Sequence, residues 1–391
     1  MQTPLRILLI VDLPWDARLG ASRVFMELAK AWQAQGHTVS KYCLSDAYPT
    51  GMVSGFLSTW RQLFFPRKAA AFVRQNRDQF DVVDALLGTL PFSKERLRFS
   101  GLVVARSVGF YRLYRDFEQT ARTKWPDQPR GKFLGRIFYS FVRKRMFQAS
   151  ENALRYCDLL NFPNEDELRY LRERIGSNKT AIVRPYGLTA ERRQCFRQTA
   201  APVSQRLAKR KISFIGTWDP RKGAKDWAEI IRHVRTSIPD VRFAFLGTLT
   251  DDRRVRQDLG LPNDEFIELV REYQPGDLPN LLSDSAAGAF PSYAEGFGFG
   301  LLEQLAAGIP TVAYDAPGPR TILQNALPDL LVPIGGVEKF AEALVRILQS
   351  DFSTYEKLAA QSLETANRFD WSTIAQETAR AYHERLIHDQ Q

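Results

Sequence analysis

The sequence predicts an α/β protein made of two doubly wound parallel sheets. Short apolar segments typical of strands alternate with segments of helical periodicity, and the alternation restarts after a polar stretch near the middle of the chain. Such alternation favours a parallel sheet covered by helices. A chain of 391 residues also exceeds one typical core and suits two domains. We therefore expect two halves facing a cleft, with ligands bound beyond the carboxyl ends of the strands.

The first half begins with the apolar run Arg6–Val11, which predicts a strand. Helical periodicity follows over Ala21–Gln33, and Gly36 supplies a stop signal. The remaining strands of this half are predicted at Thr38–Leu44, Asp81–Leu86, Gly101–Ala105, Asp158–Phe162 and Lys179–Val183. The next segment, Thr189–Lys211, is polar and basic with little apolar pattern, so we interpret it as a linker or a segment beside one.

The second half repeats the pattern. Its strands are predicted at Ile212–Ile215, Val241–Leu246, Phe266–Val270, Ala286–Phe290 and Thr311–Tyr314, with a helix at Ala224–Thr236. A last helix is predicted at Trp371–Ile387, with Leu386 and Ile387 on its apolar side. We accordingly divide the chain into a first domain of residues 1–190 and a second of residues 191–370.

The composition is that of a globular protein, with 44% hydrophobic and 25% charged residues. Three widely spaced cysteines, Cys43, Cys157 and Cys195, lack metal-ligand spacing and fit a reducing compartment. The N-terminal stretch has only a short apolar run before Asp12, which indicates a strand rather than a signal peptide. No run approaches the length of a membrane span. These observations predict a cytoplasmic protein.

The net charge of +10 is concentrated in two segments where basic and aromatic residues are interleaved, 56–68 and 106–147. Three interpretations stay open. In the first, the aromatic side chains belong to the core and the charges to a solvated face. In the second, the segments lie on an anionic membrane surface or bind a phosphate-bearing acceptor. Single-stranded nucleic acid comes last, although aromatic side chains stack bases and basic ones neutralise phosphates. We therefore predict no nucleic-acid partner.

A glycine-rich turn in the second half carries the most chemistry. Glu295 and Glu303 bracket the run Gly296–Gly300, which follows a predicted strand and opens a predicted helix. The backbone N–H groups of such a turn are donors for a diphosphate, because a helix N-terminus favours anions. The two glutamates add acceptors for hydroxyl groups. Phosphate donors beside hydroxyl acceptors suggest a nucleotide-sugar as the ligand.

Two other interpretations of this turn stay open. Glutamates at this spacing arise by chance, and glycines often serve only the turn. A dinucleotide fold would place a ribose-binding acid near Asp315, at the end of the following strand. Against that fold, the glycines begin several residues after the strand, and the run GFGFG lacks the G-x-G-x-x-G spacing.

Four local patterns resemble the family 4 retaining glycosyltransferases of the two-Rossmann GT-B type, over nearly the whole chain. The E-x7-E block Glu295–Glu303 is the most specific of them. The others are FIGTWDPRKG at Phe214–Gly223, the N-terminal stretch from Gly20 through Val39, and RPYG at Arg184–Gly187. The resemblance implies that residues 1–190 bind the acceptor and residues 191–370 the nucleotide-sugar. It also implies that the C-terminal helix, within 371–391, crosses back to the first domain.

The resemblance also implies roles for particular residues. Lys222, with Arg221 beside it, would neutralise the diphosphate, whose charge grows as it departs. Glu303 would bind the ribose and Glu295 the hydroxyls of the transferred sugar, so the catalytic set is Lys222, Arg221 and Glu295. The predicted donor-binding set is Gly20, Gly216, Thr217, Lys222, Val270, Arg271, Tyr273, Glu295, Gly296, Phe297, Gly298, Phe299, Gly300, Leu301 and Glu303. Within it, the backbone of 298–301 would cap the phosphates or the sugar ring, and Val270–Tyr273 would meet the base.

Two departures from the family pattern bear on activity. Thr217 stands where many relatives carry an arginine, and Val108 stands where a histidine is usual. Valine can neither hydrogen-bond a sugar nor polarise a leaving group. A weaker assignment places Asp12, Asp16, Arg18, Arg106 and Val108 at the acceptor.

The resemblance implies retention at the anomeric carbon by front-face displacement, without a metal or other cofactor. The two basic-aromatic segments, 56–68 and 106–147, motivate the further hypothesis that the acceptor is a glycan or a lipid-linked compound in surface polysaccharide or glycoconjugate synthesis and that the protein associates peripherally with the inner face of the membrane. Two alternatives stay open: a scaffold that binds a nucleotide-sugar without turnover, and another GT-B enzyme such as an epimerase or a phosphorylase.

Overall fold

The structure is a computed structural model, and it describes residues 3–49, 56–125, 133–261 and 265–388. Contacts divide the chain into two compact units. Unit 1 comprises Met1–Tyr186 and Trp371–Gln391, and unit 2 comprises Gly187–Asp370. Each unit is built on one six-stranded sheet, and all pairings within the two sheets are parallel.

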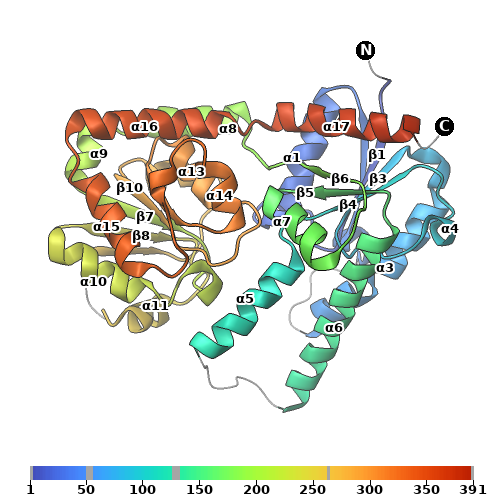
Figure 1. Ribbon diagram of the computed structural model, residues 1–391, viewed down its shortest axis with the longest axis horizontal. Helices are drawn as coiled ribbons and strands as arrows, with labels where there is room; N and C mark the ends of the chain where they lie inside the picture. Colours follow the sequence, from blue (N-terminus) through green and yellow to red (C-terminus); the bar gives the residue numbers. More distant parts are fainter. Residues whose placement is uncertain (1–2, 50–55, 126–132, 262–264, 389–391) are drawn as a thin grey trace. The chain divides into compact units, whose positions relative to one another are not determined.

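Unit 1 has the strand order β2-β1-β3-β4-β5-β6 (Figure 1). Its strands are β1 (Arg6–Val11), β2 (Thr38–Cys43), β3 (Val82–Leu86), β4 (Leu102–Arg106), β5 (Leu159–Phe162) and β6 (Ala181–Val183). Its helices are α1 (Gly20–Ala34), α2 (Leu44–Ala47), α3 (Phe56–Gln75), α4 (Lys94–Leu97), α5 (Tyr111–Lys124), α6 (Phe133–Tyr156), α7 (Glu165–Tyr170) and α17 (Trp371–His388), with short turns η1 (Arg77–Gln79) and η2 (Leu171–Ile175).

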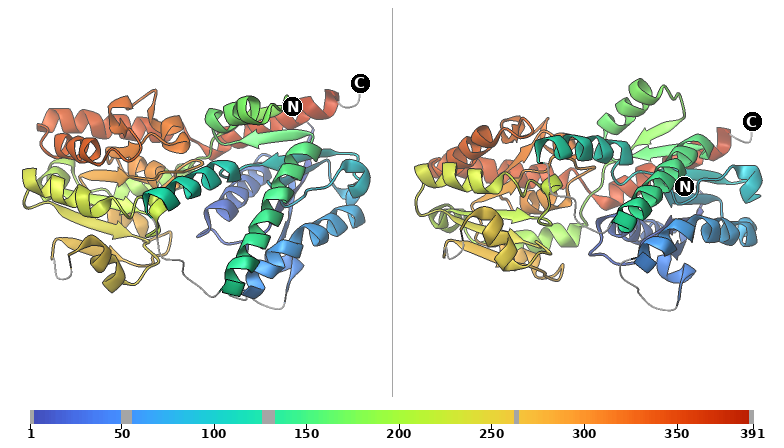
Figure 2. Two further views of the ribbon diagram at one scale, coloured as in Figure 1. Left: turned by 60° about the horizontal axis from the view of Figure 1, so that its bottom comes forward. Right: turned by 90° about the horizontal axis from the view of Figure 1, so that it is seen from below.

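The two faces of the first sheet are covered by different helices, as the alternation of side chains along a strand requires. Leu8, Val83 and Val103 belong to one core cluster together with Phe65 of α3. Residues of the other parity face α1 and α17, and there the Tyr382 hydroxyl of α17 bonds the Asp84 carboxylate of β3. Figures 1 and 2 both show α6 running alongside α3.

The C-terminal helix α17 packs within unit 1. Trp32 of α1 donates its ring N–H to the Ala375 carbonyl at 2.9 Å, deep in the interior. The face of α17 that is buried carries Trp371, Ile374, Ala375, Thr378, Ala379 and Tyr382. The expectation for its last turn is wrong, because Ile387 is 59% exposed and Leu386 only half-buried.

Unit 2 has the strand order β12-β11-β10-β7-β8-β9. Its strands are β7 (Lys211–Ile215), β8 (Arg242–Leu246), β9 (Ile267–Val270), β10 (Ala287–Phe290), β11 (Thr311–Tyr314) and β12 (Leu331–Val332). Its helices are α8 (Ala190–Thr199), α9 (Val203–Lys209), α10 (Trp227–Ser237), α11 (Asp252–Leu259), α12 (Leu278–Leu282), α13 (Phe299–Ala306), α14 (Pro317–Leu323), α15 (Val337–Leu348) and α16 (Phe352–Asn367), with turns η3 (Pro220–Lys222) and η4 (Pro328–Leu330).

The segment interpreted as a linker is folded instead, as helices α8 and α9 of unit 2. Buried arginines hold this segment against the rest of unit 2. Arg206 is 3% exposed and donates to the carbonyls of Ala307 and Gly308 at 3.1 and 2.9 Å, at the end of α13. A guanidinium there satisfies carbonyls that the helix leaves unpaired and suits the negative end of its dipole. The polar and basic composition of this segment therefore gave no indication that it packs as helices.

Candidate functional site

The second sheet reverses its winding between β7 and β10. From β7 the chain proceeds outward to β8 and β9, whereas β10 pairs on the other side of β7. The carboxyl ends of these two strands, at Ile215 and Phe290, therefore stand side by side. In doubly wound sheets this switch point is where ligands bind. The two loops that leave it carry residues predicted for the donor site.

The loop after β7 is held in shape by Asp219. Its carboxylate accepts from the backbone N–H groups of Arg221 and Lys222 at 3.0 and 3.3 Å, and from the Thr217 hydroxyl at 2.5 Å. The turn η3 ends at Gly223, whose φ of +83° suits glycine. A Cβ on Gly223 would also lie 2.3 Å from the Pro291 carbonyl oxygen. The two loops thus approach each other at a point where only glycine fits.

The predicted catalytic residues come together across these loops. The Lys222 ammonium forms an ion pair with the Glu295 carboxylate, and the Arg221 guanidinium lies 3.6 Å from the same Glu295 oxygen. Both Lys222 and Glu295 side chains are 15% exposed, so the pair is sheltered yet reachable. Lys222 also lies 5.1 Å from the centre of the Phe290 ring. Two cations and one carboxylate therefore share the switch point.

The loop after β10 is braced from below by residues that the sequence did not single out. Buried Asp226 accepts from the hydroxyls of Tyr293 and Tyr314 at 2.8 and 2.7 Å. Burial, and then the nearby Asp226 carboxylate, raise the pKa of the Tyr293 hydroxyl. These bonds fix the loop two residues before Glu295, and their long spacing in the sequence gave no local signal.

The glycine run forms the start of α13, as the pattern predicts. Gly298 precedes the helix with a φ of +107°, in the left-handed region. A Cβ on Gly300 would lie 3.1 Å from the Ile215 Cβ, so glycine lets the helix start approach the end of β7. Phe299 and Gly300 are half-buried, whereas Gly296 is buried. The first-turn N–H groups of a helix have no partner within that helix.

Two members of the predicted donor set belong to the interior by their side chains. Phe297 is 2% exposed and packs edge-on against Phe299 and Phe369, and Leu301 is fully buried. The side chains of Phe297 and Leu301 therefore cannot contact a bound nucleotide-sugar. The predicted contact with the backbone over 298–301 does not need these side chains. Gly216 follows directly after β7, and a Cβ there would lie 3.1 Å from the Phe214 ring.

Glu303 lies one turn into α13 and is 4% exposed. Arg192 of α8 reaches it, with 3.3 Å between the guanidinium and Oε1 of Glu303. Arg192 is held in turn by the Pro275 carbonyl at 2.6 Å and by the Phe196 ring, 4.5 Å from its centre. Sequence reasoning missed Arg192, although Thr189 at the N-cap of α8 is a helix-start signal.

The residues predicted to meet the base lie at the end of β9. The Val270 carbonyl accepts from the Gly247 N–H at 2.7 Å, and the Arg271 carbonyl from the Leu249 N–H at 3.1 Å. The Tyr273 ring lies against Gly247, where a Cβ would be 3.0 Å away. Val270 and Tyr273 are half-buried and Arg271 is exposed.

In unit 1 the predicted residues Asp12, Asp16 and Arg18 lie on the loop between β1 and α1, and Gly20 is the first residue of α1. A Cβ on Gly20 would meet nothing within 4 Å, so no internal packing requires glycine there. Asp16 and Arg18 pair with each other at 2.6 Å. Burial raises the pKa of the Asp12 carboxyl to about 6.

The assignment of Arg106 to the acceptor is wrong as a direct contact, because its side chain is fully buried. It pairs with Asp84 at 2.6 Å and donates to the Tyr382 hydroxyl at 2.9 Å. Val108 is half-buried two residues later. Between them, the Ser107 hydroxyl donates to the Glu167 carboxylate at 2.6 Å, and burial raises the pKa of Glu167 to about 7.

The two basic-aromatic segments belong to α3 and to the stretch from β4 through α6. Residues 126–132 and the side chains at positions 56, 133–137 and 139 lie outside the described residues. None of the described helices combines the length and apolar character that spanning a membrane requires. In the described part of the chain, no three His, Cys, Asp or Glu side chains gather as metal ligands would.

Comparison with known proteins agrees with this architecture. Residues 209–350 match the family described as Glycosyl transferases group 1. The phosphatidyl-myo-inositol mannosyltransferase of Mycobacterium leprae is 30% identical over 216 residues, which are 55% of this chain and 56% of that relative. The chain thus spans about half the length of this curated relative.

Solved structures resemble the chain over almost its whole length. Sucrose-phosphate synthase from Thermosynechococcus elongatus has a TM-score of 0.73 at 17% identity, covering 97% of this chain and 98% of that one. Anabaena HepE, solved with UDP and glucose, has a TM-score of 0.65 at 17% identity, covering 96% and 99%. At such identities the likeness concerns the fold, and the predicted two-sheet GT-B fold is confirmed. The chain thus has the GT-B fold, and its residues 209–350 resemble the family Glycosyl transferases group 1.

Proposed function

We propose that the chain is a retaining glycosyltransferase of the hexosyltransferase type, which moves a sugar from a nucleotide-sugar to a glycan or lipid-linked acceptor. Its setting would be surface polysaccharide or glycoconjugate synthesis. One observation carries the proposal: Lys222 and Arg221 meet Glu295 at the switch point of the second sheet, beside the start of α13. The relative named as a mannosyltransferase and the neighbour solved with UDP and glucose support it.

In this proposal residues 191–370 bind the donor, and residues 1–190 with 371–391 bind the acceptor. The diphosphate lies over the first-turn N–H groups of α13, next to Lys222 and Arg221. Negative charge grows on the phosphate as the bond to the sugar breaks, so cations fixed in place stabilise the transition state more than the ground state. The departing phosphate itself accepts the proton of the acceptor hydroxyl, on the face from which it leaves.

Glu295 has two tasks in the proposed cycle. Without donor it holds the two cations close together, which limits the repulsion between them. When the donor binds, the phosphate replaces the carboxylate as partner of Lys222. Glu295 then turns its oxygens to the hydroxyls of the transferred sugar.

Glu303 would bind the ribose hydroxyls, and Arg192 would position it. Arg192 contacts Oε1 of Glu303 at 3.3 Å and would hold the carboxylate in position for the ribose. Arg192→Ala should raise KM for the donor with little change in kcat, since ribose binding is equal in ground and transition states. Arg192→Lys should restore part of the loss, because a lysine keeps the charge. A fall in kcat alone would contradict this role.

We also propose that Lys222 and Arg221 supply the positive charge that a divalent cation supplies in other transferases. Turnover should therefore persist in EDTA and show no gain when Mg²⁺ or Mn²⁺ is added back. A large metal-dependent gain would refute this part of the proposal without affecting the donor site.

A second candidate is a scaffold that binds a nucleotide-sugar without turnover. Its support is Val108, an apolar side chain where the family usually has a histidine, together with Thr217, whose hydroxyl is engaged by Asp219. It differs from the first candidate only in the absence of product. An epimerase would instead isomerise the donor without acceptor, and a phosphorylase would release sugar only with phosphate.

The test is thermal stabilisation by a panel of nucleoside diphosphates and nucleotide-sugars, for the wild type, Glu303→Ala and Lys222→Ala. A ligand at a hundred times its Kd stabilises by about 2.7 kcal/mol, which raises the melting temperature measurably. We expect a base-selective shift that both substitutions abolish. Nucleotide release from the selected donor, measured with and without acceptor extracts, then separates the enzyme from the inert scaffold. No shift with any nucleotide would refute the donor site.

A further inference from the structure

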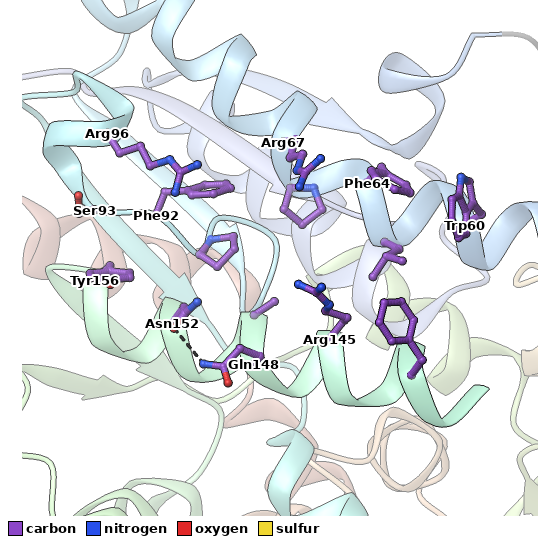
Figure 3. A pocket seen from close by; sticks show the side chains of 15 residues that line it. Trp60, Phe64, Arg67, Phe92, Ser93, Arg96, Arg145, Gln148, Asn152 and Tyr156 are labelled. Carbon is purple, nitrogen blue, oxygen red and sulfur yellow. Dashed lines mark hydrogen bonds between the residues drawn. The ribbon is translucent and has the colours of Figure 1, made fainter. Parts of the chain in front are cut away.

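A groove lies between helices α3 and α6 in unit 1, and none of the residues that line it belongs to the predicted donor site. Its cavity volume is about 500 Å³, within the range typical of small-molecule sites. One wall carries Trp60, Phe64 and Arg67 of α3, and the opposite wall carries Arg145 of α6 (Figure 3). Phe141, also of α6, lines the groove too. Helical spacing explains both rows, because residues three and four apart share a helix face.

The charge in the groove is positive and uncompensated. Arg67, Arg145 and Arg96 all line it. Among the described residues no carboxylate lies within ion-pair distance of these three, whereas Arg112 and Arg143 of α5 and α6 each have such a partner. Each lies near an aromatic ring instead, Arg67 near Phe64 at 5.6 Å and Arg145 near Phe141 at 5.3 Å. Such guanidinium groups are suited to a phosphate.

The end of the groove that carries Trp60 and Phe141 is apolar and exposed. Trp60 and Phe141 are 42% and 45% exposed, and Leu57 and Met146 nearby are 47% and 37% exposed. Helix α3 leads into β3 and α6 into β5, so the Trp60–Phe141 end lies toward the carboxyl edge of the sheet. A 24-residue helix is about 36 Å long and overhangs a four-residue strand. Exposed aromatic and aliphatic side chains beside arginines are typical of a membrane interface.

We propose that this α3–α6 groove binds one anionic phospholipid of a membrane leaflet. Its phosphate lies between Arg67 and Arg145, and the first part of an acyl chain lies along Trp60, Phe64 and Phe141, while the remainder stays in the leaflet. The carboxyl edge of the first sheet then faces the membrane. The inference deepens the membrane-surface part of the proposed function and rests on it only there, because the groove shares no residue with the donor site.

The test is co-sedimentation of the full chain with phosphatidylcholine vesicles, with and without phosphatidylglycerol, at low ionic strength. We expect binding only when phosphatidylglycerol is present. The double variant Arg67→Gln/Arg145→Gln should bind about 30-fold more weakly, since each basic residue at an anionic surface contributes about fivefold. The control is Lys68→Gln/Lys144→Gln, which removes two other positive charges from the same two helices, each one residue away from an arginine of the groove. Because Lys68 and Lys144 do not line the groove, this control should lose no more than about fivefold.

A second pair of variants tests the acyl chain. Trp60→Ser/Phe141→Ser keeps every charge and should lose at least about tenfold in vesicle binding, because two exposed apolar side chains no longer enter the leaflet. Its control is Phe352→Ser/Ile387→Ser, two other exposed apolar side chains, which should bind as the wild type does. All variants should keep the wild-type melting temperature and its nucleotide shift, so loss of folding or of donor binding is detected separately.

Several outcomes would overturn the proposal. Equal losses of vesicle binding in the arginine variant and the lysine variant would mean diffuse electrostatic attraction. An absence of binding to phosphatidylglycerol vesicles would show that an anionic phospholipid is not the ligand. Release by glycerol phosphate beyond the effect of sodium chloride at the same ionic strength would assign the arginines to a soluble phosphate. Retained lipid binding without any nucleotide shift would refute the donor site and leave the groove standing.

Discussion

Two pairs of opposite charge lie near strand ends, one in each unit, and they differ in burial. Arg106 and Asp84 in unit 1 are fully buried, whereas Lys222 and Glu295 in unit 2 are each 15% exposed. The buried pair sits on neighbouring strands, and Tyr382 of α17 completes it. The other pair sits on two loops at a switch point. Equal chemistry thus serves a brace in one place and a candidate site in the other.

Burial decides the difference. Burial by itself would lower the pKa of Arg106, but the nearby Asp84 outweighs it and holds that pKa above its usual value. A guanidinium so placed stays charged and cannot exchange its partner for a ligand without reopening the core. Lys222 keeps 15% of its side chain exposed, so a phosphate can reach it and replace the carboxylate. The contrast predicts that one pair governs stability and the other governs turnover.

The largest effect is expected from Asp84→Asn. The substitution leaves the buried Arg106 charge uncompensated, which costs about 3–5 kcal/mol of unfolding free energy. Urea unfolding measures it. Asp81→Asn is the matched control, because Asp81 pairs with Arg6 at the surface and such pairs contribute about 0–1 kcal/mol. Equal losses in the two variants would abolish the distinction between brace and surface pair.

Lys222→Ala should act on the reaction rather than on folding. We expect kcat to fall by about 10²–10³, or about 2.7–4 kcal/mol, as for one lost donor to a developing negative charge. The unfolding free energy should change by less than about 1 kcal/mol, since the pair is partly exposed. Lys225→Ala, three residues away and exposed, should leave both quantities unchanged. If Lys222→Ala unfolds the protein with kcat intact, its pair is a brace too.

Glu167 is a third buried charge-bearing group, a carboxyl with no cation beside it in the described residues. Burial raises its pKa from 4.5 to about 7, so the folded state binds the proton more tightly than the unfolded state. The tighter proton binding stabilises the folded state by at most about 3 kcal/mol. This stabilisation is complete below pH 4.5 and is lost as the pH rises to about 7. Urea unfolding at several pH values should show the decline, and Glu167→Gln should flatten it. A decline of the same size in Glu167→Gln would assign it to other groups.

The smallest effect on stability is expected at Gly20. A Cβ there meets nothing within 4 Å, and alanine favours a helix start, so Gly20→Ala should unfold at the same urea concentration or gain up to about 1 kcal/mol. If Gly20 admits the donor phosphate, the same substitution should raise KM for the donor. Gly36→Ala, at a φ of +88°, is the opposite control and should lose stability while sparing KM. An unchanged KM in Gly20→Ala would remove Gly20 from the donor site.

Sequence reasoning performed best where local rules apply. Strand and helix positions follow from apolar periodicity, and the turn at Gly298 and the close approach at Gly300 follow from what a side chain would obstruct. It failed at Thr189–Lys211, where buried arginines bond carbonyls and leave no apolar pattern. It failed also at Arg106, whose type and position fit a ligand contact but whose side chain is buried.

The sequence by itself determined the elements, their alternating order, the glycine-rich turn and the resemblance to a GT-B transferase, because these depend on neighbours along the chain. Which charges meet depends on the folding of the whole chain. Lys222 and Glu295 are 73 residues apart, Arg106 and Tyr382 are 276 apart, and Arg192 and Glu303 are 111 apart. Sheet order and helix packing create these contacts, and burial then separates a brace from a site, since desolvation acts only on groups that the whole fold has enclosed.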